Sequence, residues 1–100
     1  MELYRHGDLL VARTDKIPDD AKKLHHLVLA EGELTGHSHR VAERDRAVVY
    51  QSNSEKYISV TADHVTLIHQ EHGPIVLRQG VYRVWRQREY SPGEIRTVRD

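Results

Sequence analysis

Two histidines separated by a single residue, His37 and His39, form the pattern in this chain that points most directly to chemistry. They lie in the segment Gly36–Glu43, which we predict to be a β-strand. Residues i and i+2 of a strand point to the same face with Cα atoms about 7 Å apart, so both imidazoles can converge on one metal ion. Glu43 has the same parity, and its carboxylate can join them if the strand is unbroken.

A second pair, His69 and His72, stands just before the Gly73-Pro74 turn. Added to the first pair, it can complete a three-histidine site or a site of two histidines and one carboxylate with open positions. We therefore predict a site for a divalent metal (Zn, Fe, Mn or Ni), which would activate water or polarise a substrate oxygen. The predicted ligands are His37, His39, Glu43, His69 and His72. The same imidazoles could instead bind a polar ligand, or exchange protons as general acid and base, so the sequence leaves open whether the protein is an enzyme.

The other four of the eight histidines lack this spacing. His6 and His64 are isolated, and His25 and His26 precede a predicted strand in a polar setting. We expect all four to be surface groups rather than ligands.

The segment from Gly32 to Glu43 reads Gly-Glu-Leu-Thr-Gly-His-Ser-His-Arg-Val-Ala-Glu. It resembles the first motif of the cupins, a glycine followed by His-x-His and then by Glu. The resemblance implies a small β-barrel in which His37, His39 and Glu43 ligate a metal. The second cupin motif, Pro-x-Gly-x-x-His, aligns with a segment that has Arg78 and Arg83 at its first and last positions. A fourth ligand would therefore have to come from His69 or His72.

A stretch rich in arginine and aromatic residues suggests a different class of function. It contains Arg83, Trp85, Arg86 and Arg88. Guanidinium groups bind phosphate, and an exposed aromatic ring beside them can stack on a base, so this stretch could dock onto nucleic acid or a protein partner. The protein would then be a non-enzymatic module, acting as a homo-oligomer or as a subunit of a larger assembly. The alternative is an ordinary strand whose arginines pair with Glu31, Glu33 or Glu43.

Length and composition narrow the classes of protein. The chain has 100 residues, with 15 Lys and Arg balanced by 15 Asp and Glu, and it contains no Cys. That length predicts one domain, and the missing cysteines exclude a disulfide scaffold, a thiolate zinc site and a cysteine nucleophile. We see no apolar run long enough to cross a membrane and no signal peptide, so we expect a cytoplasmic protein without a membrane partner. Motifs typical of ATPases, Rossmann oxidoreductases and α/β-hydrolases are also missing.

Short apolar runs between turn residues predict an all-β fold, a small antiparallel barrel or sandwich of six to eight strands. We place the strands at Asp8–Arg13, His26–Glu31, Gly36–Glu43, Arg46–Gln51, Lys56–Thr61, His64–His69, Pro74–Leu77 and Val81–Glu89. The segment Pro18–Leu24 could be one helical turn or a charged loop. Ser91 and Glu94 form a capping box, which predicts a short C-terminal helix over Pro92–Arg99. The whole chain, residues 1–100, is then one β domain.

Overall fold

A computed structural model of the chain describes residues 3–31, 38–53 and 55–86. In this part every regular element is a β-strand and every pairing is antiparallel, which confirms the predicted all-β class. The predicted helix at residues 92–99 and the end of the predicted strand at 81–89 lie outside the described residues. The eight strands are β1 (Leu3–His6), β2 (Leu9–Thr14), β3 (Lys22–Lys23), β4 (Val28–Glu31), β5 (Ser38–Val41), β6 (Ala47–Ser52), β7 (Glu55–Ile68) and β8 (Ile75–Arg86).

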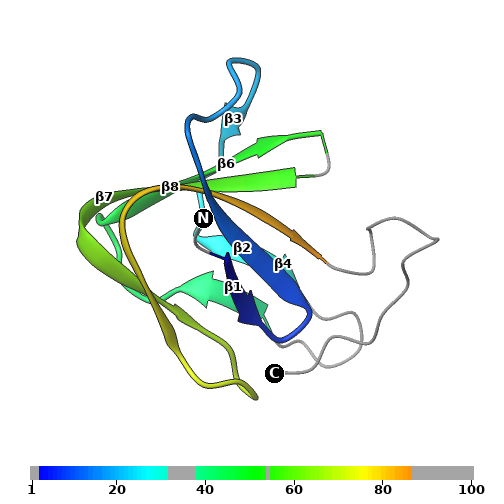
Figure 1. Cartoon of the computed structure of the whole chain (residues 1–100), viewed down its shortest axis with the longest axis vertical. Coiled ribbons are helices and arrows are strands. Elements are labelled where there is room, and N and C mark those ends of the chain that lie inside the picture. The colour runs from blue at the N-terminus through cyan, green and yellow to red at the C-terminus, as the bar shows by residue number, and fades with distance from the viewer. Residues whose placement is uncertain (1–2, 32–37, 54, 87–100) are drawn as a thin grey trace.

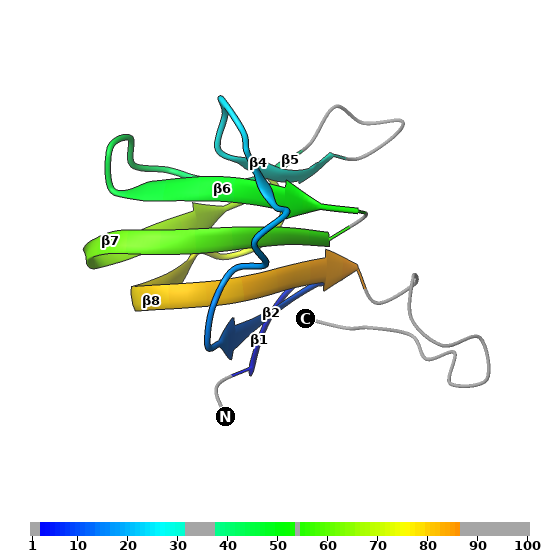
Figure 2. The ribbon, with the colours of Figure 1, turned by 90° about the horizontal axis from the view of Figure 1, so that it is seen from above.

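The strands form a single sheet that curls into a half-barrel (Figure 1). Its order is β1-β2-β8-β7-β5-β4, and β6 pairs with both β7 and β3 beside this path. Figure 2 shows β6, β7 and β8 side by side, with β2 next to β8. Strand β1 is the first in this order and β5 is the last but one, yet the curl of the sheet brings them close together. Their side chains meet in the site described below.

The concave side of the sheet holds the core. Alternation along the strands turns aliphatic side chains inward, as the sequence pattern predicts for a sheet with one buried face. Leu67, Leu77, Val49 and Tyr82 are fully buried there. Leu24, Leu27, Tyr4 and Ile75 pack against this cluster while remaining partly exposed.

Strand β7 is irregular at its middle, and this irregularity shapes the whole sheet. The pairing of Val60 with Gly80 is followed by that of His64 with Arg78, so β7 carries two more residues than β8 between these pairs. The first half of β7 pairs with β6, and its last residues pair with β5. Strands β5 and β6 therefore leave β7 at different places, and a gap opens between them.

The structure corrects two expectations about the elements and decides between the two alternatives for Pro18–Leu24. The predicted strands at 56–61 and 64–69 fall in the single strand β7, which ends at Ile68. The described part of the predicted strand at 81–89 falls in β8, together with residues 75–77 of the one at 74–77. Gly80, which stands in the gap between the predicted strands at 74–77 and 81–89, lies inside β8, because β7 accommodates its extra residues as a bulge rather than a hairpin. The segment Pro18–Leu24 is not helical: a turn in which Ala21 N–H donates to the Pro18 carbonyl leads into the short strand β3.

Candidate functional site

Four histidine side chains gather at one end of the half-barrel, and we call them the histidine cluster: His6, His39, His69 and His72. The distances between their ring centroids run from 4.4 Å (His39 to His69) to 6.2 Å (His6 to His69). His6 and His39 are 2% and 4% exposed, although imidazoles are seldom so deeply buried unless their polar atoms have partners.

Three separate parts of the chain position this cluster. His6 ends β1, directly before the tight Gly7-Asp8 turn that leads into β2. His39 lies in β5 with its side chain on the buried face. Arg40 of β5 pairs with Ile68 of β7, so continuing the antiparallel register past the end of β7 places His69 opposite His39.

The loop between β7 and β8 is held by its own polar contacts. Gln70 Oε1 accepts a hydrogen bond from the backbone N–H of Ser38 at 3.0 Å, which ties the loop to β5. Nδ1 of His69 accepts a hydrogen bond from the N–H of Glu71 at 2.9 Å. His69 in its neutral form therefore carries its proton on Nε2.

The two buried histidines meet through their Nδ1 atoms, which lie 3.0 Å apart. Nε2 of His6 lies 3.0 Å from the Gly73 carbonyl oxygen, which can only accept a hydrogen bond, so this nitrogen carries a proton. In a neutral His6 the other nitrogen, Nδ1, therefore has no proton and presents a lone pair. Nε2 of His39 lies 3.5 Å from the carboxylate of Asp8. The Nδ1 atoms of the two rings therefore face each other. Their Nε2 atoms, the outer nitrogens, each face an oxygen.

The electrostatics of the cluster disfavour a protonated His39. The pKa of His39 is lowered from 6.5 to about 4, mainly by burial and also by the neighbouring imidazoles of His6, His69 and His72, while Asp8 opposes the decrease. His39 is therefore neutral at pH 7. A neutral imidazole has a lone pair on one nitrogen, which is the form that binds a metal ion.

The structure brings together only some of the predicted ligands. His39, His69 and His72 lie in the cluster, whereas His37 lies outside the described residues. Glu43 faces Thr66 instead: its carboxylate accepts hydrogen bonds from the Thr66 N–H and hydroxyl, both at 2.8 Å. These bonds contribute to a lowered pKa of Glu43, against the opposing effect of desolvation. Because β5 ends at Val41, the strand parity that linked Glu43 to the histidines does not extend to it.

His6 is the cluster member that the sequence did not reveal. We expected it at the surface because no other histidine is near it in the sequence, and this expectation is wrong. Its neighbour His39 is 33 residues away, and the two meet only because the sheet curls. His25, His26 and His64 are exposed, as expected.

As the side chains stand, no three His, Asp or Glu residues within the described ranges form a group that could hold a metal ion. A pocket of about 340 Å³ opens beside the cluster, lined by Arg5, His6, Glu71, His72, Gly73 and Ile75. The cluster therefore combines a close histidine pair, two further imidazoles and access from outside.

The arginine-rich end of β8 is partly occupied by contacts within the protein. Arg83 binds the Glu55 carboxylate through Nε at 3.0 Å and through Nη2, and its guanidinium lies 4.5 Å from the centre of the Trp85 ring. Trp85 Nε1 is buried without a hydrogen-bond partner among the described residues. Arg86 is half-buried and Arg88 lies outside the described residues.

No helix in the described part of the chain is long and apolar enough to cross a membrane. Comparison with curated proteins and with solved structures gives no significant match. A family model does match, over residues 5–87, which include the last two residues of β1, the histidine cluster and β8. The chain therefore belongs to the family described as a domain of unknown function, DUF8820.

Proposed function

We propose that the histidine cluster binds a divalent first-row metal ion, with Nδ1 of His6 and Nδ1 of His39 as its first two ligands. The observation that carries the proposal is the approach of these two atoms to 3.0 Å. Two lone pairs at this distance repel each other unless a proton or a metal ion lies between them.

The partners of the outer nitrogens favour the metal ion. If His39 Nδ1 donates a proton to His6, the bare Nε2 of a neutral His39 must face the Asp8 carboxylate at 3.5 Å, acceptor against acceptor. With a metal ion between the Nδ1 atoms, Nε2–H of His39 can donate to Asp8 while Nε2–H of His6 donates to Gly73. Carboxylate and carbonyl acceptors on the outer nitrogen are the usual support of metal-bound histidines.

The distance between the Nδ1 atoms bears on the choice of metal. Two nitrogens 3.0 Å apart and each about 2.1 Å from one ion subtend an angle of about 90°, which suits neighbouring positions of an octahedral or tetragonal site. A tetrahedral zinc site needs about 3.4 Å between its nitrogens, so the rings would have to separate slightly. This favours Ni, Fe or Mn among the predicted metals, with Zn requiring more adjustment.

His72 and His69 would complete the site after their rings turn. His69 must release the N–H of Glu71 before its Nδ1 can bind a metal, and both residues lie in a loop rather than in a strand. The resemblance of the segment Gly32–Glu43 to the first cupin motif supports His39 as a ligand, although Glu43, which that motif would also make a ligand, is bound to Thr66. A bound metal would activate water or polarise an oxygen ligand arriving through the adjacent pocket.

Metal titration of untagged, metal-depleted protein tests the proposal. We expect one Ni²⁺ or Co²⁺ per chain by calorimetry, with ligand-field absorption for Co²⁺. The variants H6A and H39A should each lose binding by more than about tenfold, as expected when a ligand is removed. Variants H25A and H64A, which change exposed histidines outside the cluster, should bind like the wild type. Equal binding by all four variants, or no binding by folded wild type, would contradict the proposal.

Docking of nucleic acid or protein by β8 has less support. Its central arginine, Arg83, is already engaged by Glu55 and Trp85, and the balanced charge of the chain lacks the basic footprint of nucleic-acid binders. Titration of Trp85 fluorescence with a short single strand at low salt is the direct measurement of this function.

A further inference from the structure

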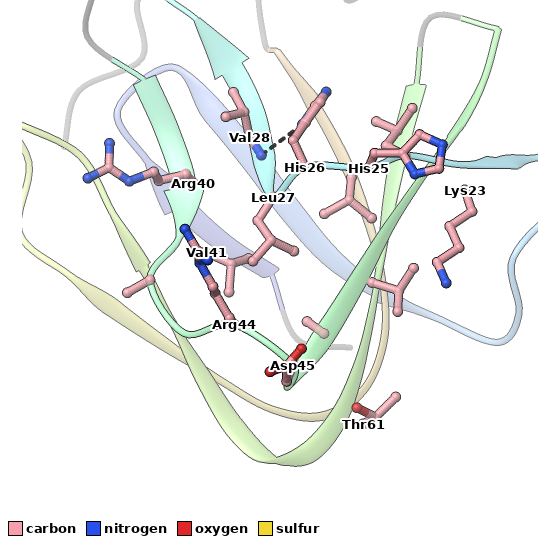
Figure 3. A pocket seen from close by; sticks show the side chains of 15 residues that line it. Lys23, His25, His26, Leu27, Val28, Arg40, Val41, Arg44, Asp45 and Thr61 are labelled. Atoms are coloured by element: carbon pink, nitrogen blue, oxygen red, sulfur yellow. Dashed lines mark hydrogen bonds between the residues drawn. The ribbon is translucent and has the colours of Figure 1, made fainter.

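The geometry points to a second binding site, separate from the histidine cluster: a pocket between β5 and β6 that takes a small organic carboxylate with an apolar body. The pocket has a volume of about 800 Å³, within the range of ligand sites in proteins. Figure 3 shows Leu27, Val41 and Arg44 in the space between the two strands.

The pocket follows from the topology of the sheet. Strand β6 pairs with the part of β7 before its bulge and β5 with the part after it, so among the described residues no strand fills the gap between β5 and β6. The segment between β3 and β4 crosses this gap, and backbone hydrogen bonds join it to β6 on one side and to β5 on the other. Leu24 N–H donates to the Val49 carbonyl at 2.8 Å, and Val41 N–H donates to the Leu27 carbonyl at 3.0 Å.

The inner wall of the pocket is apolar. Val41, Ala47 and Val49 belong to the buried core, while Leu24 and Leu27 pack against that core and remain partly exposed. An alkyl or aryl group entering the pocket would therefore cover the aliphatic surface of Leu24 and Leu27 that water now reaches. Such burial favours binding by roughly 25 cal/mol per Å² of apolar surface.

The rim of the pocket is cationic. Among the described residues, its charged lining consists of Lys23, Arg40, Arg44 and one acidic residue, Asp45. Within the described ranges none of the three basic side chains forms an ion pair with an acidic side chain. Their aliphatic stems can lie along the apolar wall while their charged ends attract an anion.

A histidine adds a fixed donor at the same rim. Nδ1 of His26 accepts a hydrogen bond from the N–H of Val28 at 3.1 Å, which Figure 3 marks with a dashed line. Neutral His26 therefore carries its proton on Nε2 and can donate it to a carboxylate. An apolar wall below a rim of donors and cations matches a fatty acid of medium chain length or an aryl carboxylate.

Octanoate is the probe for this site, and octylamine, which has the same chain length and the opposite charge, is its matched control. We expect octanoate to shift the backbone amide signals of Leu27, Val41 and Val49 in a two-dimensional ¹H–¹⁵N NMR titration. The double variant R40Q/R44Q should weaken octanoate binding at least about fivefold, whereas R78Q, which changes an exposed arginine of β8 outside the pocket, should have no effect.

Three outcomes would overturn the inference. The first is an octanoate titration that leaves the three pocket amides unshifted. The second is equal affinity for octanoate and octylamine, which would assign binding to apolar contact alone. The third is tighter binding of an oligoglutamate peptide that shifts rim amides but not Val49, which would assign the rim to an acidic polypeptide. Because Arg40 and Arg44 are exposed and do not pack in the core, the R40Q/R44Q protein should keep the wild-type NMR spectrum outside the pocket.

Discussion

Gly7 and His72 are in direct contact: a Cβ atom added to Gly7 would lie 2.7 Å from Nε2 of His72 and 3.1 Å from Cε1 of His39. Gly7 also has a positive φ of 66°, which residues with side chains adopt at a cost. The turn between β1 and β2 and the packing of the histidine cluster therefore depend on the same missing side chain.

The variant G7A tests this dependence. We expect a loss of at least about 1 kcal/mol in the free energy of unfolding, because an L-residue in the left-handed region costs roughly 1–2 kcal/mol. The added methyl group should also push His72 out of the cluster and weaken metal binding. Denaturant unfolding and metal titration measure the two effects separately.

Gly73 offers a matched control on the other side of the cluster. A Cβ added there meets nothing within 4 Å, and the residue does not have a positive φ. G73A should therefore keep both the stability and the metal affinity of the wild type. If G73A lost metal binding as strongly as G7A, steric displacement of His72 would not be the cause.

Acid should destabilise the metal-free protein through His39. Its pKa is about 4 in the folded protein and 6.5 when unperturbed, so the unfolded chain binds a proton more readily between these values. The free energy of unfolding should therefore be highest above pH 6.5 and fall as the pH drops towards 4, by at most about 3 kcal/mol from this residue. Urea unfolding at several pH values measures this fall.

The variant H39N separates this residue from other titrating groups. The asparagine amide occupies nearly the place of Nδ1 but cannot take up a proton. Its free energy of unfolding should depend less on pH than that of the wild type between pH 6.5 and 4. H64N, which changes an exposed histidine, should follow the wild-type curve, and equal curves for all three proteins would contradict the prediction.

The pair of Glu55 and Arg83 should lose its stabilising effect in acid. Hydrogen bonds from Arg83 are the main cause of a lowered pKa of Glu55, against the opposing effect of desolvation. The pair is therefore fully formed above the ordinary pKa of 4.5 and disappears as the pH falls through the lowered value. Both side chains are partly exposed, so a double-mutant cycle of E55Q and R83Q at pH 7 should give a coupling of no more than about 1 kcal/mol. A coupling that persists unchanged at pH 2 would contradict this account.

Local sequence patterns were sufficient to predict β2 and the strands from β4 to β8, but they predicted neither the short strands β1 and β3 nor which predicted segments join into one strand. Alternating apolar residues correctly indicated the β elements on both sides of Asp63 and Gly80. A glycine or aspartate in such a pattern favours a turn as readily as a bulge. The choice between them depends on which strand lies opposite, and the neighbours of β7 change along its length.

The histidine cluster was predictable only as far as it is local. His39, His69 and His72 were selected from spacing that involves single segments. Whether His6 joins them depends on the curl of a sheet whose end strands are far apart in the order, and Glu43 is diverted by the nearby Thr66. Contacts that arise from sheet closure leave no periodic signal in the sequence.

Arg13 and Gly80 provide a last test, one that concerns the bulge itself. The Arg13 guanidinium lies over Gly80, where a Cβ atom would overlap it, and Gly80 has a φ of 147°. From there Arg13 donates to the Gln79 carbonyl at 3.2 Å and to the Tyr82 hydroxyl at 3.0 Å, and it stacks over the Tyr82 ring. G80A should therefore cost about 1–3 kcal/mol of stability through backbone strain, plus the loss of these Arg13 contacts.

A double-mutant cycle with R13A separates the two contributions. In the R13A protein the Cβ atom of an alanine at position 80 no longer overlaps a guanidinium, and there are no Arg13 contacts left to lose. The backbone strain of an alanine at this position remains. We therefore expect G80A to destabilise the R13A protein less than the wild type, by a difference of about 1 kcal/mol, the typical net value of a hydrogen bond. Equal effects of G80A in both backgrounds would mean that backbone conformation alone requires glycine at this position, and that Arg13 packs over Gly80 without depending on it.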